Sequence, residues 1–361
     1  MKEQLSLAEI ERFAQIASGR LEIEEAMEII IKSEDIKSTK DCGTGTCDWD
    51  TKQVDRKSLY LRFVEDKLKL FRSEIAKLNL DHGFFSVEGC TSSLKTHLLT
   101  ECDFYCLPTI VYEINLRRLQ KSLKGVSSKD RYEYYFRHFN FFEDYPKLVS
   151  LLEEFTSSTV NSLLEAVRNI KEDRSHLILR FRLSDKDILK EINFFPNGDR
   201  HFGKQTMKLT FSSGVSLVYK SQIIQNEQLT AEIFDLVNRY IKDGKVKNYL
   251  FLDRKNRFYK EFIKYDGKVN SRQDAQNFYL EMGHILAICY LTNATDIHME
   301  NLVANDGHVY VIDRETFFHH NQIIGFSDEN DLFATGLLAN PNPQGTKASS
   351  VTGIFGGQES R

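Results

Sequence analysis

The pair Asp306-Gly307 is the feature that most constrains how this chain folds, because it stands between two short, β-rich runs. A type I′ turn requires a positive φ at both central residues, and Asp-Gly meets that requirement readily. A two-residue turn at this point pairs Asn301 with Ile312. The Asn301 amide and the Asp313 carboxylate are then expected on neighbouring cross-strand positions, roughly 5–8 Å apart at Cβ.

Three polar residues are spaced around this hairpin as they are in kinases. Asp296 precedes Asn301 by five residues, and Asp313 follows Asn301 by twelve. In kinases the first aspartate handles the substrate hydroxyl, while the asparagine and the second aspartate hold Mg²⁺. Amide and carboxylate oxygens suit an Mg²⁺ ion that phosphates also bind. The hairpin alone would equally be an ordinary turn with polar ends, but the spacing favours a phosphoryl-transfer site.

Composition indicates a globular protein and excludes several classes of function. The chain has 361 residues, of which 41% are hydrophobic and 28% charged, and its net charge of −4 gives no reason to expect a nucleic-acid partner. No apolar run approaches the roughly 20 residues that cross a bilayer, and the N-terminus does not resemble a secretory signal. We therefore expect a cytoplasmic protein with free cysteines.

The pattern of the chain changes near residue 196. Residues 1–195 are expected to be mostly helical, with a short β-like or buried run at 109–115. Residues 196–266 alternate strands with one helix, and residues 267–361 begin with a strong helix that leads into the loop of Asp296. The predicted strands cover 206–211, 215–220, 249–252 and 257–263, and the predicted helices cover 226–241 and the segment that starts at 271.

This order of elements is the layout of a kinase-like small lobe followed by the start of a large lobe. Agreement between element order and motif spacing is stronger than either alone. Lys220 ends the second predicted strand, where a kinase lysine reaches the nucleotide phosphates and is held by a helix carboxylate. Glu227 and Glu232 on the following helix are both candidates for that carboxylate. A solvated lysine at a strand end is the alternative interpretation.

Further polar residues near these motifs are candidates for a role in the same site. Asp296 is expected to orient or deprotonate a Ser/Thr hydroxyl. His298 could shield developing charge, although a lone histidine is more often structural. Glu315 is a candidate metal ligand or an anchor for one. The Gly-containing segment 198–204 could fold over phosphates, which is a weak signal by itself.

Several stretches resemble the N-terminal dehydratase region of LanM-type class II lanthipeptide (lantibiotic) synthetases. The resemblance runs from about residue 80 to the C-terminus and rests on a combination of motifs. The matching stretches are 110–117, Gly198-Asp-Arg-His201, Gly214-Val-Ser-Leu-Val-Tyr-Lys220, Asp296-Ile-His-Met-Glu-Asn301, Val311-Ile-Asp-Arg-Glu-Thr-Phe-Phe318, Thr335-Gly-Leu-Leu338 and Thr352-Gly-Ile-Phe-Gly-Gly357.

The resemblance implies an α+β fold, with a lipid-kinase-like bilobal core embedded in helical additions. It implies phosphorylation of Ser/Thr in a lanthipeptide precursor, leader and core together, with ATP and Mg²⁺, followed by phosphate elimination. The implied residues fall into three groups. They are Asp296, His298 and Glu315 for catalysis, Lys220, Asp199 and His201 for cofactor binding, and Asn301 and Asp313 for the metal.

The chain departs from the family pattern in two respects. Arg314 stands where the family usually has an aliphatic residue, and strand alternation predicts that it points away from Asp313 and Glu315. Only 48 residues follow Asp313, so we expect a truncated or split synthetase without the elimination and cyclisation parts. A catalytically silent fragment, or a peptide-binding module that needs a separately encoded second half, is the alternative. A small-molecule kinase would leave the helical N-terminal half unexplained.

Overall fold

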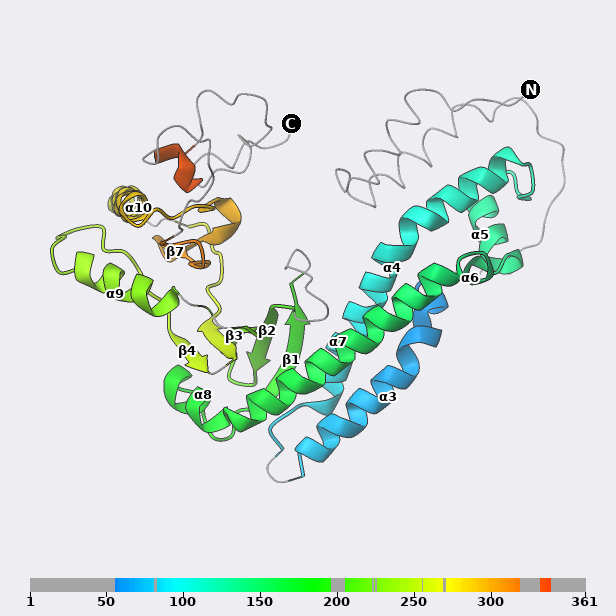
Figure 1. Ribbon diagram of the computed structural model, residues 1–361, viewed down its shortest axis with the longest axis horizontal. Coiled ribbons are helices and arrows are strands. Elements are labelled where there is room, and N and C mark those ends of the chain that lie inside the picture. Colours follow the sequence, from blue (N-terminus) through cyan, green and yellow to red (C-terminus); the bar gives the residue numbers. More distant parts are fainter. Residues whose placement is uncertain are drawn as a thin grey trace. The chain divides into compact units, whose positions relative to one another are not determined.

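The computed structural model of the chain describes residues 56–80, 83–195, 205–222, 224, 226–254, 256–268, 271–318 and 332–338. These residues form two compact units, the first ending at Lys171 and the second beginning at Glu172. Helices and an antiparallel sheet are both present, in agreement with the predicted α+β class (Figure 1). Within the described ranges, every helix is too short or too polar to cross a membrane.

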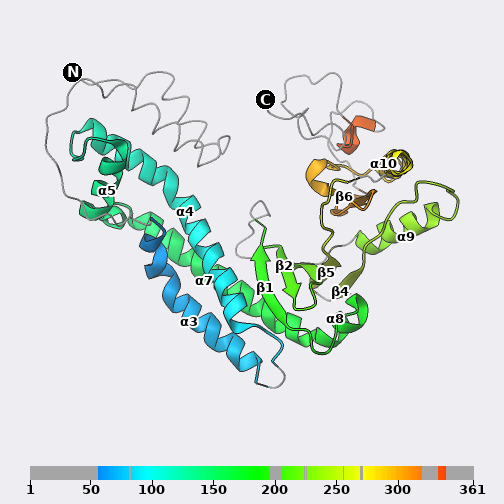
Figure 2. The same cartoon turned by 180° about the vertical axis from the view of Figure 1, so that it is seen from behind.

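Three long helices make up most of the first unit: α3 (Leu61–Leu78), α4 (Val87–Leu119) and α7 (Pro146–Glu172). They lie side by side in both ribbon views (Figures 1 and 2). The Lys67 ammonium lies 2.6 Å from the Glu153 carboxylate and joins α3 to α7. The shorter elements are η1 (Arg56–Tyr60), α5 (Ser128–His138) and α6 (Phe141–Asp144). The mostly helical character predicted for this part of the chain is confirmed for its described residues.

The run 109–115 is helical, so its interpretation as a β-like segment is wrong. It lies in the C-terminal half of α4, one residue after Pro108. Ile110 and Val111 are buried, in agreement with the alternative that the run is simply part of a core. A short apolar run does not distinguish a buried strand from a buried helix, because both bury every apolar side chain.

The second unit contains a five-stranded antiparallel sheet with the strand order β1-β2-β3-β5-β4. The four strands predicted between residues 206 and 263 are confirmed, with ends that differ by up to two residues. Gly214 closes the β2–β3 turn with a φ of +88°, which costs glycine little. The strands are β1 (Leu189–Phe194), β2 (Met207–Phe211), β3 (Ser216–Lys220), β4 (Phe251–Arg254) and β5 (Arg257–Glu261).

The sequence did not predict strand β1, which lies in the region expected to be helical. Its pairing with β2 shifts register between Leu189 and Glu191. A bulge places an extra residue in one strand and breaks the alternation of inward and outward side chains. The burial of Leu189 and Ile192, three residues apart, therefore imitates a helical spacing.

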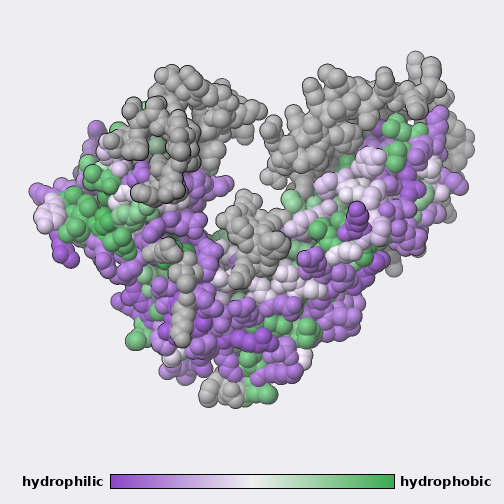
Figure 3. Space-filling model, in the orientation of Figure 1, coloured by the Kyte–Doolittle hydropathy of each residue, from purple (hydrophilic) through white to green (hydrophobic). Residues whose placement is uncertain are grey.

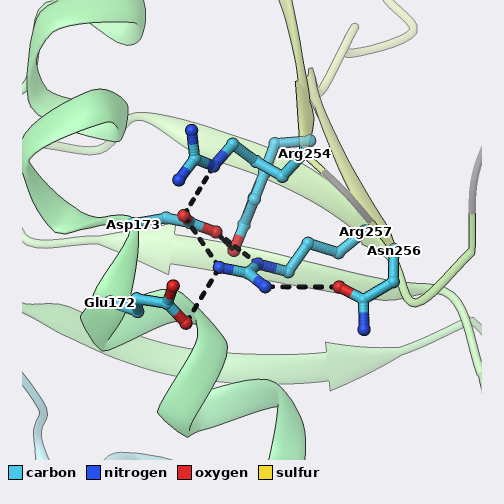
Figure 4. A network of polar contacts seen from close by, with 6 residues as sticks. Glu172, Asp173, Arg254, Asn256 and Arg257 are labelled. Carbon is cyan, nitrogen blue, oxygen red and sulfur yellow. Dashed lines mark hydrogen bonds and ion pairs between the residues drawn. The ribbon is translucent and has the colours of Figure 1, made fainter.

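Asp173 ties helix α8 (Arg174–Phe181) to the β4–β5 hairpin (Figure 4). Its fully buried carboxylate accepts hydrogen bonds from Arg254 Nε at 2.8 Å, Arg257 Nη2 at 2.9 Å and the Tyr259 hydroxyl at 2.8 Å. Burial alone would raise the pKa of Asp173, but the hydrogen bonds from Arg257 and Tyr259 lower it overall. The sheet is thus fixed to the preceding helix through one buried charge.

Helices α9 (Glu227–Val237) and α10 (Arg272–Leu291) pack with the hairpin β6 (Leu302–Asn305) and β7 (His308–Val311). Asp306 and Gly307 have φ values of +49° and +72°, so the predicted Asp-Gly turn is confirmed. The shared core contains Phe234, Ile285, Cys289 and Val311. On α9 the opposite side remains exposed at Leu229 and Leu236, and Figure 3 shows hydrophobic surface over this helix.

Candidate functional site

A pocket of about 570 Å³ opens between the sheet and the loops that flank the hairpin, entirely within the second unit. This volume lies in the range of small-molecule sites. Strands β3 and β5 supply one wall, and the segments around 296–301 and 312–316 supply the other. The lining residues are Phe195, Thr206, Val218, Lys220, Lys260, Glu261, Phe262, Ile263, Asp296, His298, Glu300, Asn301, Ile312, Asp313, Glu315 and Thr316.

Six of the predicted site residues line this one pocket. They come from strand β3, from the loop before β6 and from the segment after β7, so the fold gathers side chains that are far apart in the chain. They are Lys220, Asp296, His298, Asn301, Asp313 and Glu315. Asp199 and His201, together with the rest of the segment 198–204, lie outside the described residues.

The loop of Asp296 is held in a tight conformation by its own polar groups. Asp296 has a φ of +61°, an uncommon backbone conformation that its surroundings must stabilise. The Asn301 side-chain amide donates to the Asp296 carbonyl oxygen at 2.8 Å. Because Asn301 Nδ2 is committed to this bond, the amide oxygen Oδ1 is the atom that can accept a donor or bind a cation.

His298 orients the same loop and has a defined tautomer. The short helix η2 (Met299–Asn301) follows it, and the Glu300 backbone N–H donates to His298 Nδ1 at 3.2 Å. In the neutral ring Nδ1 therefore accepts and Nε2 carries the hydrogen. His298 Nε2 lies 3.3 Å from the Asp296 carboxylate. The imidazole thus connects the Asp296 side chain to the start of η2.

Lys220 forms an ion pair with Asp313, whose Oδ2 lies 3.1 Å from the lysine Nζ. The expectation that Glu227 or Glu232 pairs with this lysine is wrong. Glu227 is buried and pairs instead with Arg314 at 3.4 Å, and Glu232 accepts a hydrogen bond from Gln228. The strand lysine is therefore joined to a proposed metal ligand rather than to the helix.

The segment after β7 presents alternate residues to opposite sides. Asp313 and Glu315 line the pocket, whereas Arg314 is fully buried and its guanidinium lies 4.2 Å from the ring centre of Tyr249 and 4.7 Å from that of Phe234. The expectation that Arg314 points away from the two acids is confirmed. This alternation allows one short segment to serve both the pocket and the core.

Lys260 is a pocket residue that the sequence interpretation missed. It pairs with Val218 in the β3–β5 register and is only 6% exposed. Its ammonium donates a hydrogen bond to the Ile312 carbonyl oxygen. Burial and the neighbouring charge of Lys220 lower the pKa of Lys260 to about 8. The signal available in the sequence was its position in an inner strand, two residues before the apolar pair Phe262-Ile263.

The available donors limit how this pocket can hold a cation. Within the described ranges, no group of three or more His, Cys, Asp or Glu side chains is arranged to bind a metal. Asn301 and Asp313 provide an amide and a carboxylate oxygen in the same pocket. Mg²⁺ is typically bound by one or two protein carboxylates, with phosphates and water completing the shell. The donor set therefore fits an Mg²⁺ ion that arrives with a phosphorylated ligand.

Comparison with known proteins identifies a family model and a relative that match this chain. Residues 145–359 match the family model described as Domain of unknown function (DUF4135). The chain is also similar to the Lacticin 481/lactococcin biosynthesis protein LcnDR2 of Lactococcus lactis subsp. lactis. The two are 25% identical over 284 residues, which cover 71% of this chain and 30% of that relative. The chain thus spans less than a third of the length of this relative.

Proposed function

Because this chain belongs to the DUF4135 family and is related to LanM-type lanthipeptide synthetases, we propose that it is a peptide kinase. Its proposed reaction is the phosphorylation of Ser and Thr side chains of a lanthipeptide precursor peptide with ATP and Mg²⁺. Phosphorylation converts a hydroxyl into a leaving group, so the product is prepared for elimination to a dehydroamino acid. The proposal is restricted to the phosphorylation step, because the aligned part covers only 30% of the relative.

One observation carries the proposal: a single pocket is lined by Lys220, Asp296, Asn301 and Asp313. These are the residue types that phosphoryl transfer requires for phosphate binding, hydroxyl activation and metal binding. Lys220 and Asp313 are 93 residues apart in the chain and still form an ion pair. An ordinary hairpin with polar ends would not require this convergence.

The walls of the pocket differ in character in a way that suits a nucleotide. Val218 provides apolar surface from strand β3, and Phe262 and Ile263 provide it from the residues that follow β5. The Asp296–Asn301 loop and Asp313 provide polar groups. We propose that the apolar part receives the base and that the polar part receives the phosphates, with strands β1–β5 and α9 acting as a kinase-like small lobe and the segment from α10 onward as the start of a large lobe.

Each residue then has a specific task. Asp296 accepts the proton of the attacking hydroxyl, and His298 holds that carboxylate in place through Nε2. Lys220 binds phosphate oxygens. Asn301 and Asp313 would hold Mg²⁺, which neutralises charge on the phosphates when bound.

Two groups of residues complete the proposed site. Glu315 is proposed to support the metal-binding side of the pocket. Asp199 and His201, outside the described residues, are proposed as further contacts to the nucleotide.

Incubation with a lacticin 481 precursor peptide, ATP and Mg²⁺, followed by mass spectrometry, tests this function. We expect peptide that gains phosphate without losing water, and no gain when Asp296 is replaced by Asn. Binding of the precursor without any phosphate gain in the presence of ATP and Mg²⁺ would identify a peptide-binding module instead. Phosphorylation of aminoglycosides, with the peptide unmodified, would indicate a small-molecule kinase.

A further inference from the structure

We propose that Lys260 is a positioning residue of this pocket, whose hydrogen bond to the Ile312 carbonyl sets the place of the Asp313 carboxylate. The inference rests on the proposed function in that it adds a residue to the same site. Asp313 is the residue next to Ile312, so a shift of the Ile312 peptide moves the proposed metal ligand with it.

Both the N–H and the carbonyl oxygen of Ile312 are hydrogen-bonded. Its N–H donates to the Asn301 carbonyl oxygen at 2.9 Å, and its own carbonyl oxygen accepts from the Lys260 ammonium. The bond to Asn301 links Ile312 to one proposed metal ligand. The bond from Lys260 fixes the peptide between Ile312 and the other proposed ligand, Asp313. Lys260 therefore acts on the spacing between Asn301 and Asp313.

The sheet places Lys260 and Lys220 on the same face. Val218 pairs with Lys260, and Lys220 is two residues along from Val218 on β3. Side chains two residues apart in a strand, and those of directly paired residues, project from the same face. Two neighbouring strands thus direct two ammonium groups to two successive residues, Ile312 and Asp313.

Arg314 is a third positively charged side chain that binds this segment, at the residue before Ile312. Arg314 Nε donates to the Val311 carbonyl oxygen at 3.2 Å. Val311, Ile312 and Asp313 therefore each accept a hydrogen bond from a different positively charged side chain. Hydrogen bonds from charged donors are about twice as strong as neutral ones, so this segment is fixed more firmly than an ordinary loop.

The burial of Lys260 supports a positioning role. A buried ammonium is unfavourable unless it is paired and hydrogen-bonded. At 6% exposure, Lys260 satisfies this requirement with the Ile312 carbonyl and with the ring of Tyr249, whose centre lies 5.4 Å from Nζ. A lysine that only supplied positive charge to the pocket would not need a carbonyl partner in the backbone.

Three variants separate positioning from charge. Lys260→Met removes the donor and the charge, Lys260→Gln keeps an N–H donor without the charge, and Lys264→Met removes an exposed lysine outside the pocket. Hydrogen exchange at the Ile312 amide reports how firmly its N–H is held by the Asn301 carbonyl, one peptide before the carbonyl that Lys260 binds. We expect about tenfold faster exchange in Lys260→Met, near wild-type exchange in Lys260→Gln and no change in Lys264→Met.

Binding of ATP, titrated with and without Mg²⁺, connects the position of the peptide to the site. In Lys260→Met we expect the Mg²⁺ concentration for half-maximal ATP binding to rise about 10- to 100-fold, while ATP binding without Mg²⁺ stays near that of the wild type. Lys260→Gln should need about the same Mg²⁺ concentration for half-maximal ATP binding as the wild type.

The outcomes distinguish failure of the inference from failure of the proposed function. Equal exchange at Ile312 in Lys260→Met and wild type would overturn the positioning role, as would equal loss of ATP binding with and without Mg²⁺. If Lys260→Met does not fold, Lys260→Gln decides: a higher Mg²⁺ requirement for ATP binding without faster exchange at Ile312 would overturn the positioning role. Wild-type protein that binds no ATP would contradict the proposed function, and the exchange measurement would still decide the role of Lys260.

Discussion

Lys220 Nζ and Asp313 Oδ2 lie 3.1 Å apart, and this ion pair joins the five-stranded sheet to the segment that follows hairpin β6–β7. The side chains of Lys220 and Asp313 are 11% and 29% exposed. Partly exposed ion pairs contribute little to the free energy of unfolding. The relationship is therefore better explained by the pocket that both residues line than by stability.

Replacing Asp313 by Asn tests this interpretation. The amide keeps the shape of the carboxylate and removes the charge, so we expect Mg²⁺-dependent ATP binding to weaken about 10- to 100-fold, measured by calorimetric titration. The urea midpoint of unfolding should change little. Asp253→Asn, on the exposed side of β4, is the matched control and should bind as the wild type does. Unchanged Mg²⁺ dependence in Asp313→Asn would exclude Asp313 as a ligand.

The buried pair Glu227–Arg314 gives a prediction about stability. Their side chains are 3% and 0% exposed, and neither terminal nitrogen of Arg314 has a hydrogen-bond partner among the described residues. Removing one member leaves a buried charge unpaired, so Glu227→Leu or Arg314→Met should each lower the free energy of unfolding by about 3–5 kcal/mol. The double variant should be close to wild type, because apolar side chains replace a buried pair well.

Urea denaturation of the wild type, the two single variants and the double variant measures the coupling between Glu227 and Arg314. The exposed pair Asp66–Lys69 on α3 is the control, and there neither single replacement should change the urea midpoint. If the losses of unfolding free energy in the two single variants simply add in the double variant, the charges of Glu227 and Arg314 do not depend on one another.

The pKa of Asp173 predicts how stability depends on pH. Its folded pKa is lowered, with hydrogen bonds from Arg257 and Tyr259 outweighing burial. The ionised carboxylate therefore stabilises the fold fully above its ordinary pKa of about 3.9, and this contribution is lost as the pH falls through the lowered value. Asp173→Asn should be less stable than wild type at pH 6, and the gap should narrow below about pH 4.

Free energies of unfolding in urea, measured from pH 3 to pH 6, check this prediction. Asp185→Asn changes an exposed carboxylate in the same region and should follow the wild-type curve. A gap between wild type and Asp173→Asn that stays constant over the whole range would mean that the charge of Asp173 is not the origin of its effect.

Local signals in the sequence were sufficient for the elements around the pocket, but not for every partner. The Asp306-Gly307 turn is determined by two adjacent residues, so the hairpin was predictable. The partner of Lys220 was not, because it depends on how the sheet packs against a segment 93 residues away. Lys260 was missed for the same reason: its partner is a backbone carbonyl, which leaves no trace in the type of residue at position 312.

Gly336 provides a final prediction, which connects a motif outside the pocket to the Asp296 loop. Its φ is +79°, and a Cβ at this position would lie 3.1 Å from the backbone nitrogen of Ile297. That nitrogen donates to the Thr335 carbonyl oxygen at 2.8 Å. Alanine at position 336 must therefore displace the peptide that follows Asp296 or strain its own backbone.

Gly214 separates these two effects, because its φ of +88° is similar and a Cβ there meets nothing within 4 Å. Both Gly336→Ala and Gly214→Ala should lose about 1–2 kcal/mol of unfolding free energy, the cost of a left-handed alanine. Only Gly336→Ala should also lower kcat for peptide phosphorylation, by about tenfold, because its Cβ displaces the Ile297 nitrogen by a few tenths of an ångström and a displacement of about 1 Å can cost about 100-fold. Equal kcat in the two variants would mean that Asp296 does not depend on this contact, whereas a selective loss assigns the Thr335-Gly336 turn the task of placing the proposed catalytic base.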